Sequence, residues 1–273
     1  MAKGVVKMSN IKTTDTGSIE IKNVYRTYLD ANGNEVEALN NININIEPGE
    51  FISLIGPSGC GKTTLMRLIA GLDTPQQGTL VLDGEKINGT NYERGFVFQQ
   101  ANLFPWQTVE KNISAGLKAR KVYKEQKDEV AHYIEIAGLK GFEKSYPHQI
   151  SGGMAQRASL VRALINKPKV LLLDEPLGAL DSFTRFDLQD KLIELWNERG
   201  NTMILVTHDV DEAIYLSDRI AIMTSRPGKI EEVIEVNLKR PRNRTGEEFV
   251  RLRKEILEKL HLASRVKPVE YYI

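Results

Sequence analysis

A run of nine residues, Gly56-Pro57-Ser58-Gly59-Cys60-Gly61-Lys62-Thr63-Thr64, has the residue types and the spacing of a loop that binds a polyphosphate. Its glycines let the backbone come close to phosphate oxygens with several N–H groups turned toward them. Lys62 can place its charge on the β- and γ-phosphates, and Thr63 can place a hydroxyl on Mg²⁺. An apolar stretch precedes the loop and a helix-forming stretch follows it. The sequence therefore predicts a nucleoside triphosphate site.

Two carboxylates and a histidine follow apolar runs farther along the chain. Residues 170–173 lead into Asp174 and Glu175, and residues 203–206 lead to His208. Both runs predict buried parallel strands, whose carboxyl ends share the edge of the sheet where α/β folds bind ligands. We expect Asp174 to bind Mg²⁺ and Glu175 to orient or deprotonate the attacking water. His208 can donate a hydrogen bond to the γ-phosphate or to that water.

A second candidate for anion binding is Ser151-Gly152-Gly153, which opens a predicted helix. A serine and two glycines at a helix start can bind an anion through exposed N–H groups. Such a tripeptide on its own is more often an ordinary helix cap. Because a phosphate loop lies upstream in the same chain, however, this chain would own two phosphate-binding elements.

Three further features have two interpretations each. Gln99 ends a predicted strand, where its amide could contact Mg²⁺ or the attacking water, or could be solvated. Tyr28 follows the first predicted strand and could stack on a nucleotide base or pack on the surface. Residues 103–106 bring three bulky apolar side chains around a proline, at the edge of a core or in a docking patch for another chain.

The elements that must position these residues form an α/β fold. Residues 19–24 and 42–46 alternate apolar and polar side chains and predict an antiparallel β-layer ahead of the phosphate loop. From residue 108 to about residue 148 the pattern becomes helical, which predicts a helical subdomain inserted between two halves of the core. Residues 1–18 are expected to be a flexible tail. Residues 236–273 are too few for another domain and predict a C-terminal helical extension.

Composition excludes several classes of protein. The 273 residues carry 37 Lys and Arg against 36 Asp and Glu, a net charge of +1, so nucleic acid and anionic membranes are not expected as main partners. No apolar run approaches the roughly 18 residues of a membrane helix, and the first residues lack a secretory pattern. Cys60 is the one cysteine, which fits a reducing compartment. We expect a cytoplasmic protein.

In this order the motifs resemble the nucleotide-binding subunit of an ATP-binding-cassette (ABC) transporter, over residues 19–235. The resemblance implies a P-loop NTPase (ABC ATPase) core, with the helical subdomain at about residues 101–165. It implies that ATP and Mg²⁺ are the cofactors, that Gln99 and Glu175 act with His208 in catalysis, and that Thr63, Gln99 and Asp174 bind the metal. Tyr28 would stack on adenine, and Asp181 would contribute to the nucleotide site. One departure is Met154, which stands where the family's Ser-Gly-Gly signature usually continues with Gln.

The resemblance also implies partners. Two cassettes would pack head-to-tail, with ATP between the phosphate loop of one and Ser151-Gly152-Gly153 of the other. Integral membrane permease subunits would dock near Gln99 and residues 103–106, and an extracytoplasmic solute-binding protein would act indirectly. The chain would then lie on the inner face of the cell membrane. Residues 104–106, Met154 and residues 225–228 are similar to ATPases of importers for nitrate, sulfonates and taurine.

Other functions fit the sequence less well. A GTPase would have Asp where the motif Asn166-Lys167-Pro168-Lys169 has its last lysine, and a small-molecule kinase leaves Ser151 and His208 unexplained. The main alternative is a soluble ABC ATPase acting in DNA repair or translation, which usually has two cassettes or a long coiled coil. The basic residues 239–244 predict a solvated connector rather than a surface for lipid or nucleic acid.

Overall fold

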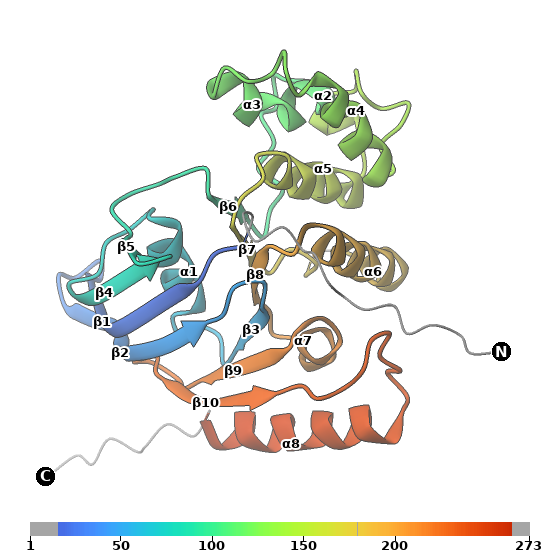
Figure 1. Cartoon of the computed structure of the whole chain (residues 1–273). Helices are drawn as coiled ribbons and strands as arrows, with labels where there is room; N and C mark the ends of the chain where they lie inside the picture. The colour runs from blue at the N-terminus through green and yellow to red at the C-terminus, as the bar shows by residue number, and fades with distance from the viewer. Residues whose placement is uncertain (1–15, 179, 264–273) are drawn as a thin grey trace, which may run out of the picture.

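Two β-sheets pack against helix α1, the helix that directly follows the phosphate loop (Figure 1). The computed structural model describes residues 16–178 and 180–263. The antiparallel sheet has the order β2-β1-β4-β5 and consists of β1 (Ile19–Leu29), β2 (Glu35–Ile46), β4 (Gln77–Leu82) and β5 (Glu85–Lys86). This sheet is the antiparallel layer that the sequence predicted, enlarged by β4 and β5.

The second sheet is the core of the fold and has the order β10-β9-β3-β8-β7-β6. Its strands are β3 (Phe51–Ile55), β6 (Arg94–Val97), β7 (Val170–Asp174), β8 (Thr202–Val206), β9 (Arg219–Met223) and β10 (Ile230–Glu235). All neighbours pair in parallel except β10, which is antiparallel to β9. The α/β class predicted from the sequence is therefore confirmed.

Helices cover both faces of this core sheet. They are α1 (Lys62–Ala70), α2 (Val109–Ile113), α3 (Ala115–Ala119), α4 (Lys127–Ile136), α5 (Gly152–Leu164), α6 (Ser182–Arg199), α7 (Val210–Leu216) and α8 (Glu247–Ala263), with a 3₁₀ turn at Pro147–Gln149. In the part of the chain that the structure describes, no helix has the length and apolarity needed to cross a bilayer.

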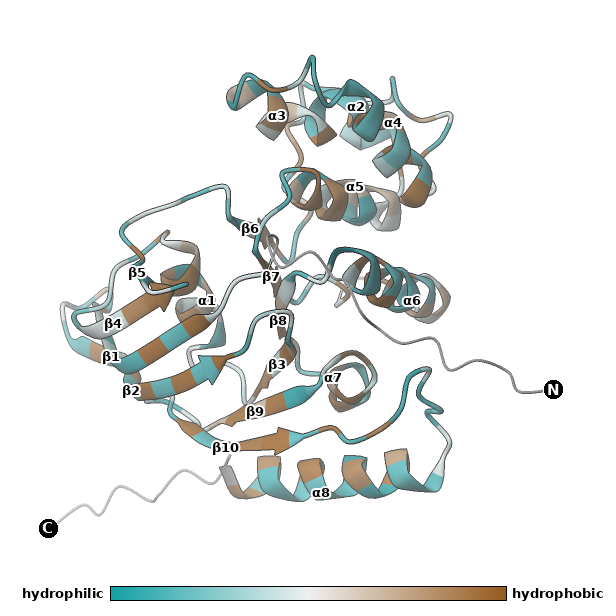
Figure 2. Ribbon diagram, viewed as in Figure 1, coloured by the Kyte–Doolittle hydropathy of each residue, from teal (hydrophilic) through white to brown (hydrophobic). Residues whose placement is uncertain are grey.

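The central strands β7 and β8 are apolar except for one polar residue at an end of each, Asp174 and Thr202, because both of their faces are buried (Figure 2). Alternate residues of a strand point to opposite faces. On β7, Val170 and Leu172 pack with α1 and the antiparallel sheet, whereas Leu171 and Leu173 pack with the helical side of the molecule. This alternation fixes which way the polar residue at the end of each strand points.

Helices α2 to α5 stand together on one side of the core sheet (Figure 1). They share a buried cluster that includes Ile113 of α2, Tyr133 of α4 and Val161 of α5. All four helices fall inside the range 101–165 that the sequence analysis assigned to an inserted helical subdomain. The subdomain thus enters between β6 and β7 and leaves the two strands paired.

The structure describes only part of the expected tail and of the expected C-terminal extension. Most of the expected tail, residues 1–15, lies outside the described residues, but residues 16–18 are attached to the core. Thr202 Oγ1 donates to the Gly17 carbonyl at 2.6 Å, and the Ser18 backbone N–H donates to Asp83 at 2.8 Å. Of the expected extension at 236–273, the structure describes residues 236–263.

The basic segment at residues 239–244 is not a solvated connector, because its arginines hold the C-terminal extension against the core. Arg242 is buried and donates to five backbone carbonyls, including those of Ile214 (2.5 Å) and Ser217 (2.6 Å) at the C-terminal end of α7. Carbonyls at a helix C-terminus lack partners within the helix and carry partial negative charge. Burial lowers the pKa of Arg242 to about 10. Arg240 Nη1 donates a hydrogen bond to Asp218 Oδ1 at 2.6 Å. The sequence missed this role because three of the five carbonyls, those of Ile214, Tyr215 and Ser217, belong to residues distant in the chain.

Replacing Arg242 by Met should destabilise the fold by about 3 kcal/mol, because several buried carbonyls lose their donor at once. Urea unfolding measures the effect. The matched control is Lys239→Met, since Lys239 is exposed in the same basic segment. Equal stability of the two variants would show that Arg242 does not hold the extension in place.

Candidate functional site

The phosphate loop connects β3 to α1 and lies against β2. Gly59 and Gly61 adopt φ values of 76° and 96°, in the left-handed region that favours glycine. A Cβ on Gly61 would meet Leu39 Cδ2 at 2.6 Å and the Ala38 carbonyl at 2.8 Å, so no larger residue fits. Gly61 precedes α1 and no side chain caps that helix. The positive end of the α1 dipole therefore faces the loop.

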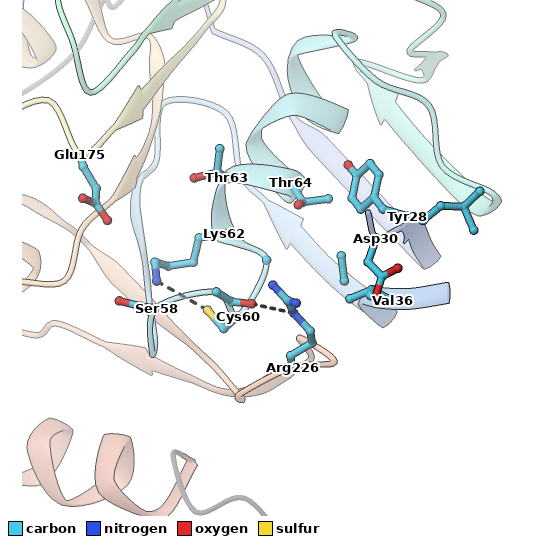
Figure 3. A pocket seen from close by; sticks show the side chains of 14 residues that line it. Tyr28, Asp30, Val36, Ser58, Cys60, Lys62, Thr63, Thr64, Glu175 and Arg226 are labelled. Carbon is cyan, nitrogen blue, oxygen red and sulfur yellow. Dashed lines mark hydrogen bonds between the residues drawn. The ribbon is translucent and has the colours of Figure 1, made fainter. Parts of the chain in front are cut away.

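A cavity of about 530 Å³ opens beside this loop (Figure 3). That volume is within the usual range of sites for small ligands. The residues lining it are Tyr28, Leu29, Asp30, Val36, Ala38, Ser58, Gly59, Cys60, Gly61, Lys62, Thr63, Thr64, Glu175 and Arg226. The structure thus gathers most of the predicted phosphate loop, the predicted aromatic residue and one predicted carboxylate around one space. Gly56 and Pro57 begin the loop but do not line the cavity.

Lys62 is held inside the phosphate loop. Its Nζ donates to the carbonyls of Gly56 (2.8 Å) and Pro57 (3.0 Å), and the residue is 6% exposed. Cys60 is buried, with its sulfur 3.6 Å from the same Nζ. A buried ammonium on a flexible stem is suited to bind phosphate oxygens as a point charge.

Thr63 and Asp174 form a pair with the chemistry of a magnesium site. The Thr63 hydroxyl, in the first turn of α1, donates to Asp174 Oδ1 at 3.2 Å. Burial raises the pKa of the Asp174 carboxyl, and the charge of Glu175 acts in the same direction, whereas the Thr63 hydrogen bond and the Lys62 charge oppose them. Positive charge near an ionised Asp174 is therefore only partly sufficient, and a divalent cation would supply more. Hydroxyl and carboxylate oxygens are ligands that Mg²⁺ prefers.

Glu175 follows one strand and contacts residues that follow the two neighbouring strands. Its Oε2 accepts a hydrogen bond from Gln99 Nε2 at 3.2 Å and lies 3.6 Å from His208 Nδ1. Gln99 follows β6, Glu175 follows β7 and His208 follows β8, and these strands are neighbours in the sheet. The His208 side chain is 68% exposed, so it is free to turn toward a ligand.

The backbone at Glu175 is strained. Its φ of 46° is uncommon for a residue with a Cβ, and such conformations persist where surrounding structure imposes them and cluster at functional sites. The Glu175 N–H donates to the Val206 carbonyl at 2.9 Å, which ties the strained residue to β8. This conformation separates the direction of the Glu175 side chain from that of Asp174. The two adjacent carboxylates can therefore have different roles.

Tyr28 forms the opposite wall of the cavity, where its orientation is fixed. Its hydroxyl donates to Asp73 Oδ2 at 2.6 Å, and the Arg26 guanidinium lies 4.6 Å from the ring centroid. Arg26 also pairs with Asp73 at 2.9 Å. With Arg26 over one face, the other face of the ring is available to an aromatic base. Sequence reasoning missed Asp73, which is linked to Tyr28 only through the tertiary fold.

The remaining predicted site residues do not line this cavity. Ser151 is exposed and caps α5, because its Oγ accepts from the Met154 N–H at 3.2 Å. Gly152 is also exposed, with open space where a Cβ would be. Asp181 is an exposed cap of α6 and accepts from the Thr184 N–H at 3.1 Å. The chain therefore presents the start of α5 to the outside and not to its own phosphate loop.

The structure adds Arg226 to the cavity, which sequence reasoning did not predict as a site residue. Its Nε donates to the Gly59 carbonyl at 3.3 Å. In the sequence, residues 225–228 stood out only for their similarity to importer ATPases. In the structure, Arg226 comes shortly after β9, and β9 is a parallel neighbour of β3. Parallel neighbours end at the same edge, so a residue after β9 can reach the loop after β3.

Comparison with known proteins agrees with this geometry. The sequence profile described as ABC transporter matches residues 39–178. The chain is 53% identical over 240 residues to the aliphatic sulfonates import ATP-binding protein SsuB of Bacillus cereus, covering 88% of this chain and 95% of the relative. It is 44% identical over 232 residues to the nitrate import ATP-binding protein NrtD of Synechocystis sp., covering 83% and 87%.

Solved structures show the same fold. A dimeric, post-hydrolysis structure of the ATP-binding cassette MJ0796 bound to ADP and Pi matches with a TM-score of 0.72 and 34% identity, covering 80% of this chain and 99% of that one. The cbiO1 subunit of the cbiONQ ABC transporter complex from Clostridium perfringens matches with a TM-score of 0.71 and 26% identity, covering 89% and 94%.

Replacing Glu175 by Gln should lower kcat for ATP hydrolysis by at least about 100-fold, because the amide cannot accept a proton from water. The Kd for MgATP should change less than about threefold, since the phosphate loop is untouched. Steady-state phosphate release and equilibrium titration measure the two effects. Glu231→Gln, on the exposed side of β10, is the control. Near-normal turnover in Glu175→Gln would remove Glu175 from the catalytic role.

Proposed function

Because the chain belongs to the ABC transporter family, we propose that it is the ATP-hydrolysing subunit of a membrane importer for a small anionic solute. The observation that carries this proposal is its likeness, over nearly its whole length, to ATP-binding proteins that import aliphatic sulfonates and nitrate. Sulfonates, taurine and nitrate are the candidate solutes. In this proposal the cavity beside the phosphate loop binds ATP.

The site residues have complementary roles in hydrolysis. Lys62 and the loop N–H groups bind the phosphates, and Tyr28 stacks on adenine. Thr63, Asp174 and the Gln99 side-chain oxygen would hold Mg²⁺, which neutralises phosphate charge when bound. Glu175 accepts the proton of the attacking water, and His208 donates to the γ-phosphate. The contacts of Glu175 with Gln99 and His208 support this assignment.

A second cassette completes the site. Ser151 and Gly152 are exposed at the N-terminus of α5, a helix of 13 residues, and do not line the chain's own cavity. In a head-to-tail dimer, their N–H groups and the Ser151 hydroxyl would bind the γ-phosphate held by the other chain. Asp181, exposed at the start of α6, would lie at the same interface. The dimeric state of the MJ0796 cassette bound to ADP and Pi supports this arrangement.

Permease subunits dock on the helical side of the molecule. Trp106 is 71% and Phe104 39% exposed, with ring centroids 5.6 Å apart, whereas Leu103 packs against the buried cluster. The pair forms an apolar surface a few residues beyond Gln99, so docking there is linked to the ATP site. We place the chain on the inner face of the cell membrane, with an extracytoplasmic solute-binding protein delivering the solute.

The alternative, a soluble ABC ATPase of DNA repair or translation, has less support. The relatives described above are import proteins. The helical insert between β6 and β7 consists of short helices and a 13-residue α5, and contains no long coiled coil.

If the proposed dimer forms, its assembly should depend on which nucleotide is bound. Glu175→Gln should form a dimer with MgATP in size-exclusion chromatography with light scattering, and a monomer with MgADP. Adding Ser151→Arg should abolish the dimer by placing bulk and charge at the start of α5. Thr79→Arg, on exposed β4, is the control that should leave the dimer intact. Dimerisation that survives Ser151→Arg would contradict the composite site.

Solute uptake tests the transport role directly. Cells that lack this chain should lose ATP-dependent uptake of a labelled aliphatic sulfonate, taurine or nitrate. The intact chain should restore uptake of one of them, and Lys62→Ala should not. Unchanged uptake of all three solutes in the deficient cells would contradict the proposed solute class.

A further inference from the structure

The segment between β9 and β10 is packed against the phosphate loop. Gly228 is wedged between the loop and β2: its N–H donates to the Ala38 carbonyl at 3.0 Å, and its carbonyl accepts from the Asn40 N–H at 2.9 Å. A Cβ on Gly228 would lie 1.9 Å from the Cys60 carbonyl oxygen, so only glycine allows this approach. The segment is therefore fixed relative to the loop.

Hydrogen bonds within the segment hold its turn in shape. The Thr224 hydroxyl donates to the Pro227 carbonyl at 3.1 Å and accepts from the Lys229 N–H at 3.0 Å. Arg226 lies at the tip of this turn, exposed, with its side chain directed toward the phosphate loop (Figure 3). A turn fixed at both ends delivers the guanidinium to a defined place.

Arg226 contacts the phosphate loop at Gly59 and also lines the cavity. Its Nε bonds the Gly59 carbonyl, and its Nη2 is 3.4 Å from where a Cβ on Gly59 would be. A single bond to a carbonyl uses one of the five N–H donors of a guanidinium. Donors that remain are available to an anion in the cavity.

The charged residues that line the cavity favour phosphate binding by Arg226. The basic residues lining it are Lys62 and Arg226, and the acidic ones are Asp30 and Glu175. Lys62 alone would leave most of the negative charge of a nucleoside triphosphate uncompensated by side chains. Arginine binds phosphate with directed, charge-assisted hydrogen bonds.

We propose that Arg226 is a second cationic nucleotide-binding residue, whose guanidinium binds phosphate oxygens of the ATP that this cavity holds. The inference rests on the proposed function in that it takes ATP as the ligand. It extends the binding site beyond the phosphate loop to the turn at residues 224–229. If Arg226 only supported the Gly59 carbonyl and did not contact ATP, its substitution would change the affinity for MgATP in a different way.

The test compares three variants of the full chain by titration with MgATP and with adenosine. Arg226→Gln keeps hydrogen-bonding groups but removes the charge, and should raise the Kd for MgATP about tenfold. Arg226→Lys should stay within about threefold of the unsubstituted chain. Lys229→Gln removes a charge from the same turn outside the cavity and should leave the Kd within about twofold. Adenosine affinity should be the same in all variants.

Steady-state hydrolysis provides the second measurement. The KM of Arg226→Gln should rise in proportion to its Kd, while kcat stays within about twofold, because a binding residue does not act on the attacking water. Unchanged MgATP affinity in Arg226→Gln would overturn the inference, as would failure of Arg226→Lys to restore it or an equal loss of adenosine affinity. If the unsubstituted chain bound no MgATP, the proposed function itself would fall.

Discussion

The parallel pairing of β6, β7, β8, β3 and β9 is the constraint on which the rest of the structure depends. The central strands β3, β7 and β8 are buried over their whole length and are mostly apolar, so the polar residues that reach the ligand site come where the strands end. Parallel direction brings all those ends to one edge. Gln99, Glu175, His208, the phosphate loop and the turn that carries Arg226 all lie there for the same reason.

The proposal that two chains share the site is based on where the helices begin. Helix α1 starts at the phosphate loop and points its N-terminus into the cavity. Helix α5 starts at Ser151, exposed and outside that cavity. In the proposed dimer, each chain would use one helix start for its own nucleotide and the other for the nucleotide of its partner. A site divided in this way gives the ATP-bound and ATP-free states different contacts between subunits, which is what a transporter needs for coupling.

Much of this could be predicted from the sequence, because the informative signals are local. The apolar runs before Glu175 and His208 identified buried strands, and the strand ends then placed these residues together. The glycine spacing of residues 56–64 identified the phosphate loop in the same way. The class of fold and the order of its parts followed from the alternation of strand and helix patterns.

What the sequence did not predict depends on residues that are distant in the chain. Arg226 meets Gly59 across 167 residues, and Tyr28 meets Asp73 across 45. Arg242 looked like a solvated charge because several of the carbonyls that it binds belong to the distant end of α7. No local pattern encodes such contacts, since each requires the sheet order to be known first.

The central claim is that ATP is held between two copies of this chain. The most direct measurement is a structure determined with MgATP trapped in the hydrolysis-deficient protein. The account predicts phosphates along residues 58–64, with the γ-phosphate between Glu175 of one protomer and the partner subunit's Ser151. A trapped nucleotide whose terminal phosphate is remote from Ser151 of both protomers would contradict it.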